Sequence, residues 1–144
     1  MASIFRDIWI DATPEEAWAA LRDVGAIHTR LAQDFVTDVQ LEEGARVVTF
    51  ASGMVARELI VGIDDDARRV AWSVVGGPMT HHNASAQVIP EAHGSRFVWI
   101  ADLLPDALAP HIAGMIELGL AAIKRTLERS ARRDGAEVEA RTCL

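Results

Sequence analysis

Arg57 is the residue whose type and position most clearly suggest chemistry, because it alternates with apolar residues in a run typical of a β-strand. If Leu59 and the apolar residues at the same spacing face an interior, Arg57 faces it as well. A guanidinium in an apolar interior needs an anionic or strongly polar partner, such as the carboxylate or carbonyl of a bound molecule. The competing interpretation is structural: Arg57 reaches the mouth of that interior cavity or pairs with a carboxylate such as Asp102 or Glu58.

Three further polar residues could take part in such a site. His82 and His111 can donate or accept hydrogen bonds near neutral pH, and Asp102 could accept a proton if it faces the interior. Each also has a structural interpretation: a solvated or hydrogen-bonded histidine, and an aspartate at a strand end that helps to cap the next helix. The candidate catalytic residues are therefore Arg57, His82 and Asp102.

Several classes of chemistry are excluded by residues that are scarce or missing. The sequence has no tyrosine, which excludes a mechanism with a phenolic hydroxyl as the catalytic acid. Its only lysine, Lys124, is predicted to lie on the outer face of a helix, which excludes a mechanism in which an amine assists a condensation. The neighbouring His81 and His82 would face opposite sides of a strand and cannot chelate one ion together. No phosphate-binding or dinucleotide-binding motif is present. We expect neither a metal nor an organic cofactor.

The composition predicts a single soluble domain. The chain has 144 residues, 50% of them apolar and 24% charged, which is typical of globular proteins. A net charge of -7 opposes binding to nucleic acid. Neither a signal peptide nor an uncharged apolar stretch of about 18 residues is evident, so we expect a cytoplasmic protein without membrane insertion, as a monomer or homodimer.

Seven segments of the sequence have the composition and alternation of β-strands. Short turns that contain glycine, aspartate, serine or proline separate most of them, and strands joined by such short turns must be antiparallel. The predicted strands cover residues 3–11, 35–41, 46–51, 55–63, 69–75, 81–89 and 96–103.

Helices are predicted in two places. After the first strand, Thr13 is a helix cap followed by Pro14, and a second short helix covers residues 27–31. After the last strand, a long amphipathic helix begins at Asp106, as its cap, and ends near Arg133. We predict one domain over residues 1–133 and a frayed tail over residues 134–144.

This order of elements predicts an α+β fold in which a curved antiparallel sheet wraps around the long C-terminal helix. The helix is the only element large enough to cover the apolar face of the sheet. Small residues such as Gly119 and Ala84 stand where helix and sheet should meet. They either permit close packing or leave a cavity, and the sequence leaves both possibilities open.

The order of elements and the segment of residues 8–18, Ile-Trp-Ile-Asp-Ala-Thr-Pro-Glu-Glu-Ala-Trp, resemble the START/Bet v 1 superfamily, also called SRPBCC. The resemblance covers about residues 3–130 and is strongest to the branch of polyketide cyclase/dehydrase and lipid-transport proteins. Residues 57–66, residues 74–77 and Asn83 also resemble the plant abscisic-acid receptors. The resemblance implies a helix-grip fold with a ligand cavity between sheet and helix.

Within that fold, two loops are expected to act as gates. The resemblance places one gate at residues 52–54, and glycines would allow both loops to move on ligand entry. The gate residues are Ser52, Gly53, Met54, Gly76, Gly77 and Pro78.

The last strand has two possible registers, with either Val98 or Trp99 facing the cavity. We favour the register with Val98 and Asp102 inside, because the resemblance places the family's pocket position at Val98. The predicted ligand-binding residues are Arg57, Leu59, Trp72, Val74, His82, Ala84, Val98, Asp102, His111, Met115 and Gly119.

Two functions are compatible with these residues, and we favour the first. It is the binding of a small hydrophobic molecule, such as a lipid, a polyketide-like compound or an aromatic compound. The second is an enzyme that cyclises, aromatises or dehydrates such a molecule by general acid/base chemistry. A protein-interaction role like that of the hormone receptors would need a partner surface that the sequence does not identify.

Overall fold

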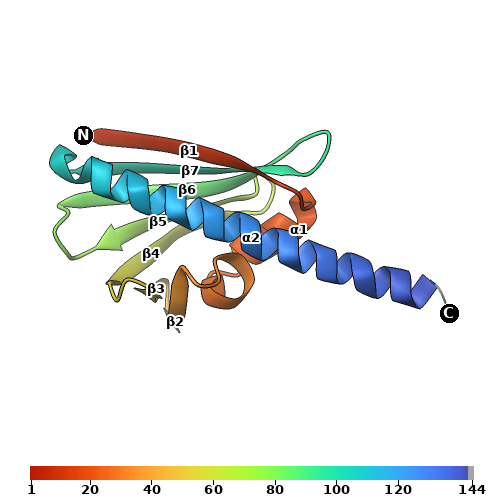
Figure 1. Ribbon diagram of the computed structural model, residues 1–144. Helices are drawn as coiled ribbons and strands as arrows, with labels where there is room; N and C mark the ends of the chain where they lie inside the picture. The colour runs from red at the N-terminus through yellow and green to blue at the C-terminus, as the bar shows by residue number, and fades with distance from the viewer. Residues whose placement is uncertain (143–144) are drawn as a thin grey trace.

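The computed structural model describes residues 1–142 and shows a seven-stranded antiparallel sheet in the order β1-β7-β6-β5-β4-β3-β2 (Figure 1). Alternating residues and glycine-rich turns place all seven predicted strands to within about one residue at each end. The strands are β1 (Ala2–Ile10), β2 (Val36–Glu42), β3 (Ala45–Phe50), β4 (Val55–Asp64), β5 (Arg69–Val75), β6 (His81–Pro90) and β7 (Ser95–Leu104).

The first helix, α1 (Pro14–Arg22), begins as the sequence predicts. The hydroxyl of Thr13 accepts a hydrogen bond from the backbone N–H of Glu16 at 3.1 Å, which satisfies a donor that the first helical turn leaves free. The second predicted helix is a short π-helical segment, η1 (Ile27–Leu31).

The long helix α2 (Ala109–Thr142) differs from the prediction at both ends. A 3₁₀ turn, η2 (Asp106–Leu108), precedes it, and Asp106 makes no capping hydrogen bond; its carboxylate lies 3.4 Å from the N-terminal amine of Met1. The helix also continues past residue 133 and extends beyond the sheet (Figure 1). Alanine and glutamate are the commonest residues of this extension, and their high helix propensity favours its helical conformation despite the lack of an apolar pattern.

The sheet curves around α2, and the core lies between them (Figure 1). The large apolar residues of α2 that are buried recur at helical spacing: Ile112, Ile116, Leu120, Ile123 and Leu127. By length and composition, the stretch Asp106–Glu137 would also be apolar enough to cross a membrane, a test that core helices pass as well. Packing against the sheet already accounts for its buried apolar stripe.

Two strands present the opposite face from the one predicted. On β4, Arg57 points outward, and its guanidinium lies 3.3 Å from the carboxylate of Glu42 in an exposed ion pair. The β3–β4 hairpin requires this orientation, because buried Val48 on β3 pairs with Ala56 on β4 and thereby turns Arg57 to the other face. Leu59 is exposed on that same outer face.

On β7, the disfavoured register is the observed one. Phe97, Ala101 and Leu103 are fully buried on the inner face. Asp102 is therefore on the outer face, where it accepts a hydrogen bond from the Ser3 hydroxyl at 2.6 Å, and Val98 lies on that face too. The larger aromatic side chains of β7 occupy the interior, where they bury the most apolar surface.

Candidate functional site

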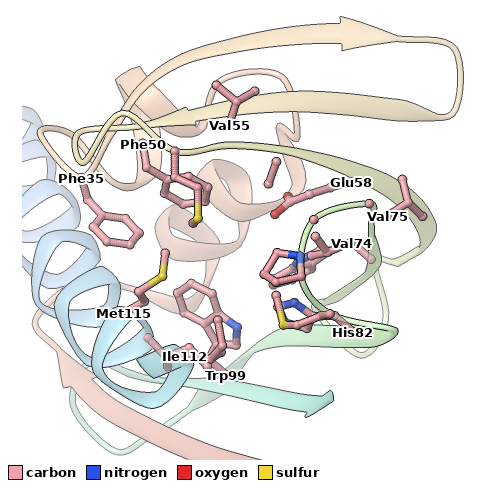
Figure 2. Close-up of a pocket in the computed structure, with 18 residues that line it drawn as sticks. Phe35, Phe50, Val55, Glu58, Val74, Val75, His82, Trp99, Ile112 and Met115 are labelled. Carbon is pink, nitrogen blue, oxygen red and sulfur yellow. The ribbon is translucent and has the colours of Figure 1, made fainter. Parts of the chain in front are cut away.

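A pocket of about 250 Å³ lies between the inner face of the sheet and the first turns of α2 (Figure 2). Strands β3 to β7, α2 and the loops around them contribute side chains to it. The lining residues are Phe35, Phe50, Met54, Val55, Ala56, Glu58, Trp72, Val74, Val75, Gly76, Gly77, Pro78, Met79, His82, Trp99, Ile112, Met115 and Ile116.

Aromatic side chains build much of the apolar wall. Phe35 and Phe50 meet edge to face with ring centroids 5.5 Å apart, and Trp72 and Trp99 do so at 5.9 Å. Gly119 makes room for this arrangement, because a Cβ at that position would lie 2.8 Å from the Trp99 ring. The small residue on α2 therefore permits close packing beside the pocket.

Two side chains of the pocket lining each carry a buried nitrogen atom that has no hydrogen-bond partner. The indole Nε1 of Trp99 and the Nδ1 of His82 are buried without a hydrogen bond in the part of the chain that the structure describes. Figure 2 shows the nitrogen of Trp99 on the side of its ring nearer to His82. Unpaired buried polar atoms cost free energy, so such atoms at a pocket are potential contacts for a ligand.

Glu58 brings a carboxylate to the pocket, but that carboxylate is already paired. Its Oε1 accepts a hydrogen bond from the Nε of Arg46 at 2.8 Å, and both side chains are buried. Arg46 also donates to the backbone oxygen of Val24 and stacks on Trp72, 5.4 Å from the ring centroid. Burial raises the pKa of Glu58, and the guanidinium of Arg46 opposes that rise.

His82 is uncharged at neutral pH. Burial lowers its pKa from the ordinary value of 6.5, and the neighbouring His81 lowers the pKa further by charge repulsion. Together, the paired Glu58 and the neutral His82 give the pocket little net charge. No cluster of three metal-ligating side chains occurs in residues 1–142.

The structure brings together part of the predicted site. Trp72, Val74, His82 and Met115 line the pocket, as do Met54, Gly76, Gly77 and Pro78 of the predicted gate loops. Ser52 and Gly53 precede Met54 in the β3–β4 turn, where Gly53 has a φ of +90°. That these residues bind a ligand or move on its entry stays a prediction.

The other predicted residues lie elsewhere. Arg57, Leu59, Val98 and Asp102 are on the outer face, for the register reasons given above, and His111 is exposed on α2. Ala84 is buried on the inner face of β6 but does not line the pocket. Gly119 does not line it either, and instead lies against the ring of Trp99, which does.

Sequence reasoning missed Glu58, Trp99, Phe35 and Phe50 as pocket residues. The β3–β4 turn carried a usable signal: once Val48 is placed inside, the register of a short hairpin brings Glu58 inside as well. For Trp99, the preference of large aromatic residues for the interior would have chosen the correct register.

An antiparallel sheet that curves around a long C-terminal helix and leaves a pocket between them defines a helix-grip protein. The family described as polyketide cyclase / dehydrase and lipid transport matches residues 1–132. The chain belongs to this family.

Solved structures share the fold at low identity. A protein of unknown function from Bacillus thuringiensis is 18% identical, with a TM-score of 0.78 over 88% of this chain and 98% of that one. A norcoclaurine synthase point mutant from Thalictrum flavum is 17% identical, with a TM-score of 0.67 over 90% and 95%. The di-domain ARO/CYC protein BexL is 17% identical, with a TM-score of 0.70 over 89% and 47%. No curated protein matches the sequence.

Proposed function

We propose that this protein binds a small, largely apolar molecule in the pocket between the sheet and α2. The observation that carries the proposal is the pocket itself: about 250 Å³ of space with mainly aromatic and aliphatic walls. Removing apolar ligand surface from water would supply most of the binding free energy. The cytoplasmic location and the monomer-or-homodimer state predicted from the sequence remain part of the proposal.

The pocket volume suggests the size of the molecule. An apolar cavity of about 150 Å³ is large enough to hold benzene. A pocket of about 250 Å³ therefore suits a compound of about two fused rings rather than a long lipid chain. Rearrangement of the loop that contains Gly76 and Gly77, both with positive φ, would enlarge the mouth for a larger molecule.

The test is to fill the pocket with a larger side chain. Met115 lines the pocket, whereas Leu118, on the same helix, is 66% exposed. We expect native mass spectrometry of the wild type to show a co-purifying apolar compound, and Met115→Trp to lose it. Leu118→Trp and Arg57→Ala should retain it, because both positions lie outside the pocket. Equal retention by Met115→Trp would show that the pocket is not the site.

One observation favours an enzyme as the second candidate. Glu58 and His82 line the same pocket, and their environments shift their pKa values in opposite directions, as is typical of groups that exchange protons with a substrate. The reaction would be cyclisation, aromatisation or dehydration of a bound ring precursor. Turnover of the co-purifying compound, abolished by His82→Gln without loss of affinity, would identify the protein as an enzyme.

A further inference from the structure

We infer that the occupant of this pocket is an uncharged ring compound that carries an oxygen substituent, and that carboxylates are rejected. This inference rests on the proposed function, because it specifies the chemistry of the molecule bound at the same site. Three features of the pocket support it: an unpaired indole N–H, a neutral histidine and the lack of a free cation.

The first feature is the N–H group of Trp99. An indole nitrogen donates hydrogen bonds and cannot accept them, so only a partner with a lone pair can satisfy it. The Nε1 is buried and has no such partner among the described residues. A hydroxyl or carbonyl oxygen on the ligand would remove this unpaired donor, whereas a pure hydrocarbon would leave it buried and unpaired.

The second feature is the charge state of the pocket wall. Burial and His81 keep His82 neutral, so its ring supplies a hydrogen-bonding atom without a positive charge. Glu58 is the only acidic residue in the lining, and the guanidinium of Arg46 already neutralises its carboxylate, so neither His82 nor Glu58 offers a bound anion a positive charge.

The third feature is that, among the side chains that the structure describes, no guanidinium or ammonium is available to a bound anion. None of the lining residues is an arginine or a lysine. Arg46, behind Glu58, already donates to that carboxylate and to the backbone of Val24. Arg57 lies outside, paired with Glu42. A carboxylate ligand would therefore lose its hydration without gaining a counter-ion.

Four naphthalene probes separate these features: naphthalene, 2-naphthol, 2-naphthamide and 2-naphthoate, each titrated by calorimetry at pH 7. The hydroxyl should increase affinity about fivefold over naphthalene, the size of one hydrogen bond. The amide and the carboxylate have nearly the same shape and differ in charge. We expect 2-naphthoate to bind at least about tenfold more weakly than 2-naphthamide.

Two tryptophan variants locate the contact. Trp99→Phe should lower the affinity for 2-naphthol about fivefold and change the affinity for naphthalene less than about twofold. Trp9→Phe is the matched control, because the Nε1 of Trp9 is bound to the backbone oxygen of His93 away from the pocket. It should leave both affinities unchanged.

The outcomes distinguish this inference from the proposed function. Binding of naphthalene without a gain for 2-naphthol, or binding of 2-naphthoate as tight as that of 2-naphthamide, would overturn the inference and leave the pocket as an apolar binding site. Failure of all four probes to bind would overturn both. An equal loss of naphthalene and 2-naphthol binding in Trp99→Phe would show that the indole acts through shape alone.

Discussion

The polar residues inside the sheet owe their charge states to their immediate neighbours. Arg46 and Glu58 neutralise each other, and His82 stays uncharged because it is partly buried beside His81. Removing one member of a buried ion pair typically costs about 3–5 kcal/mol, because the remaining charge is left without compensation. The buried pair therefore links β3 to β4 beside the pocket, and the lowered pKa of His82 makes its contribution to stability depend on pH.

His82 predicts a pH dependence of stability. Its pKa is lowered in the folded protein, so below pH 6.5 the unfolded chain takes up a proton more readily than the folded one. The stability that the protein has while His82 is neutral is therefore fully present above pH 6.5. It is lost as the pH falls toward the pKa of His82 in the folded protein. Urea unfolding of the wild type should therefore show a larger loss of unfolding free energy between pH 7.5 and 5.5 than unfolding of His82→Gln.

The control for this prediction is His111→Gln. His111 is exposed on α2, so this variant measures what a histidine-to-glutamine change does at the surface of the same protein. If His82→Gln and the wild type lose stability in parallel, His82 titrates as an ordinary solvated histidine.

The helix α2 combines two kinds of glycine within a few residues. Gly119 faces the aromatic wall, where an added Cβ would lie 2.8 Å from Trp99 and 3.1 Å from Phe35. Gly114 has no neighbour within 4 Å of the same position. The first glycine is required by packing, and the second only weakens the helix.

Substitution by alanine should separate the two positions. We expect Gly119→Ala to lower the free energy of unfolding by about 1–3 kcal/mol, because the ring of Trp99 must shift within a packed wall. Gly114→Ala should raise it by up to about 1 kcal/mol through helix propensity. Urea unfolding at constant pH measures both changes, and a Gly119→Ala variant as stable as the wild type would contradict the close packing of Gly119 against Trp99.

At the scale of the whole molecule, the positions of strands and turns follow from the local sequence. Which side chains of a strand point inward does not follow from the local sequence alone. Alternation and turn residues predict every strand, but β4 is apolar on both faces, with exposed Leu59 and Val61 outside and Ile60 inside. The hairpin partner on β3 decides between the faces, so the error at Arg57 came from treating the strand alone. The pocket itself depends on packing of side chains far apart in sequence, which periodicity does not specify.

The end of α2 carries the last whole-molecule prediction. Residues 132–137 are exposed, whereas Arg129 donates a hydrogen bond to Gln33 and Ala131 packs on the core. Deleting residues 135–144 should change the free energy of unfolding by less than about 0.5 kcal/mol and reduce the helical circular dichroism. Deletion from Arg129 onward is the comparison, and it should be clearly destabilising; equal effects would mean that the extension stabilises the fold.

The extension of α2 places the C-terminal end of this helix far from the pocket. The pocket involves the first turns of the helix, at Ile112 and Met115, while the helix leaves the sheet at its other end (Figure 1). A dye, a solid support or a fused domain attached at the far end would therefore leave the entrance unobstructed. A label at that end would test the proposed binding without contacting the pocket lining.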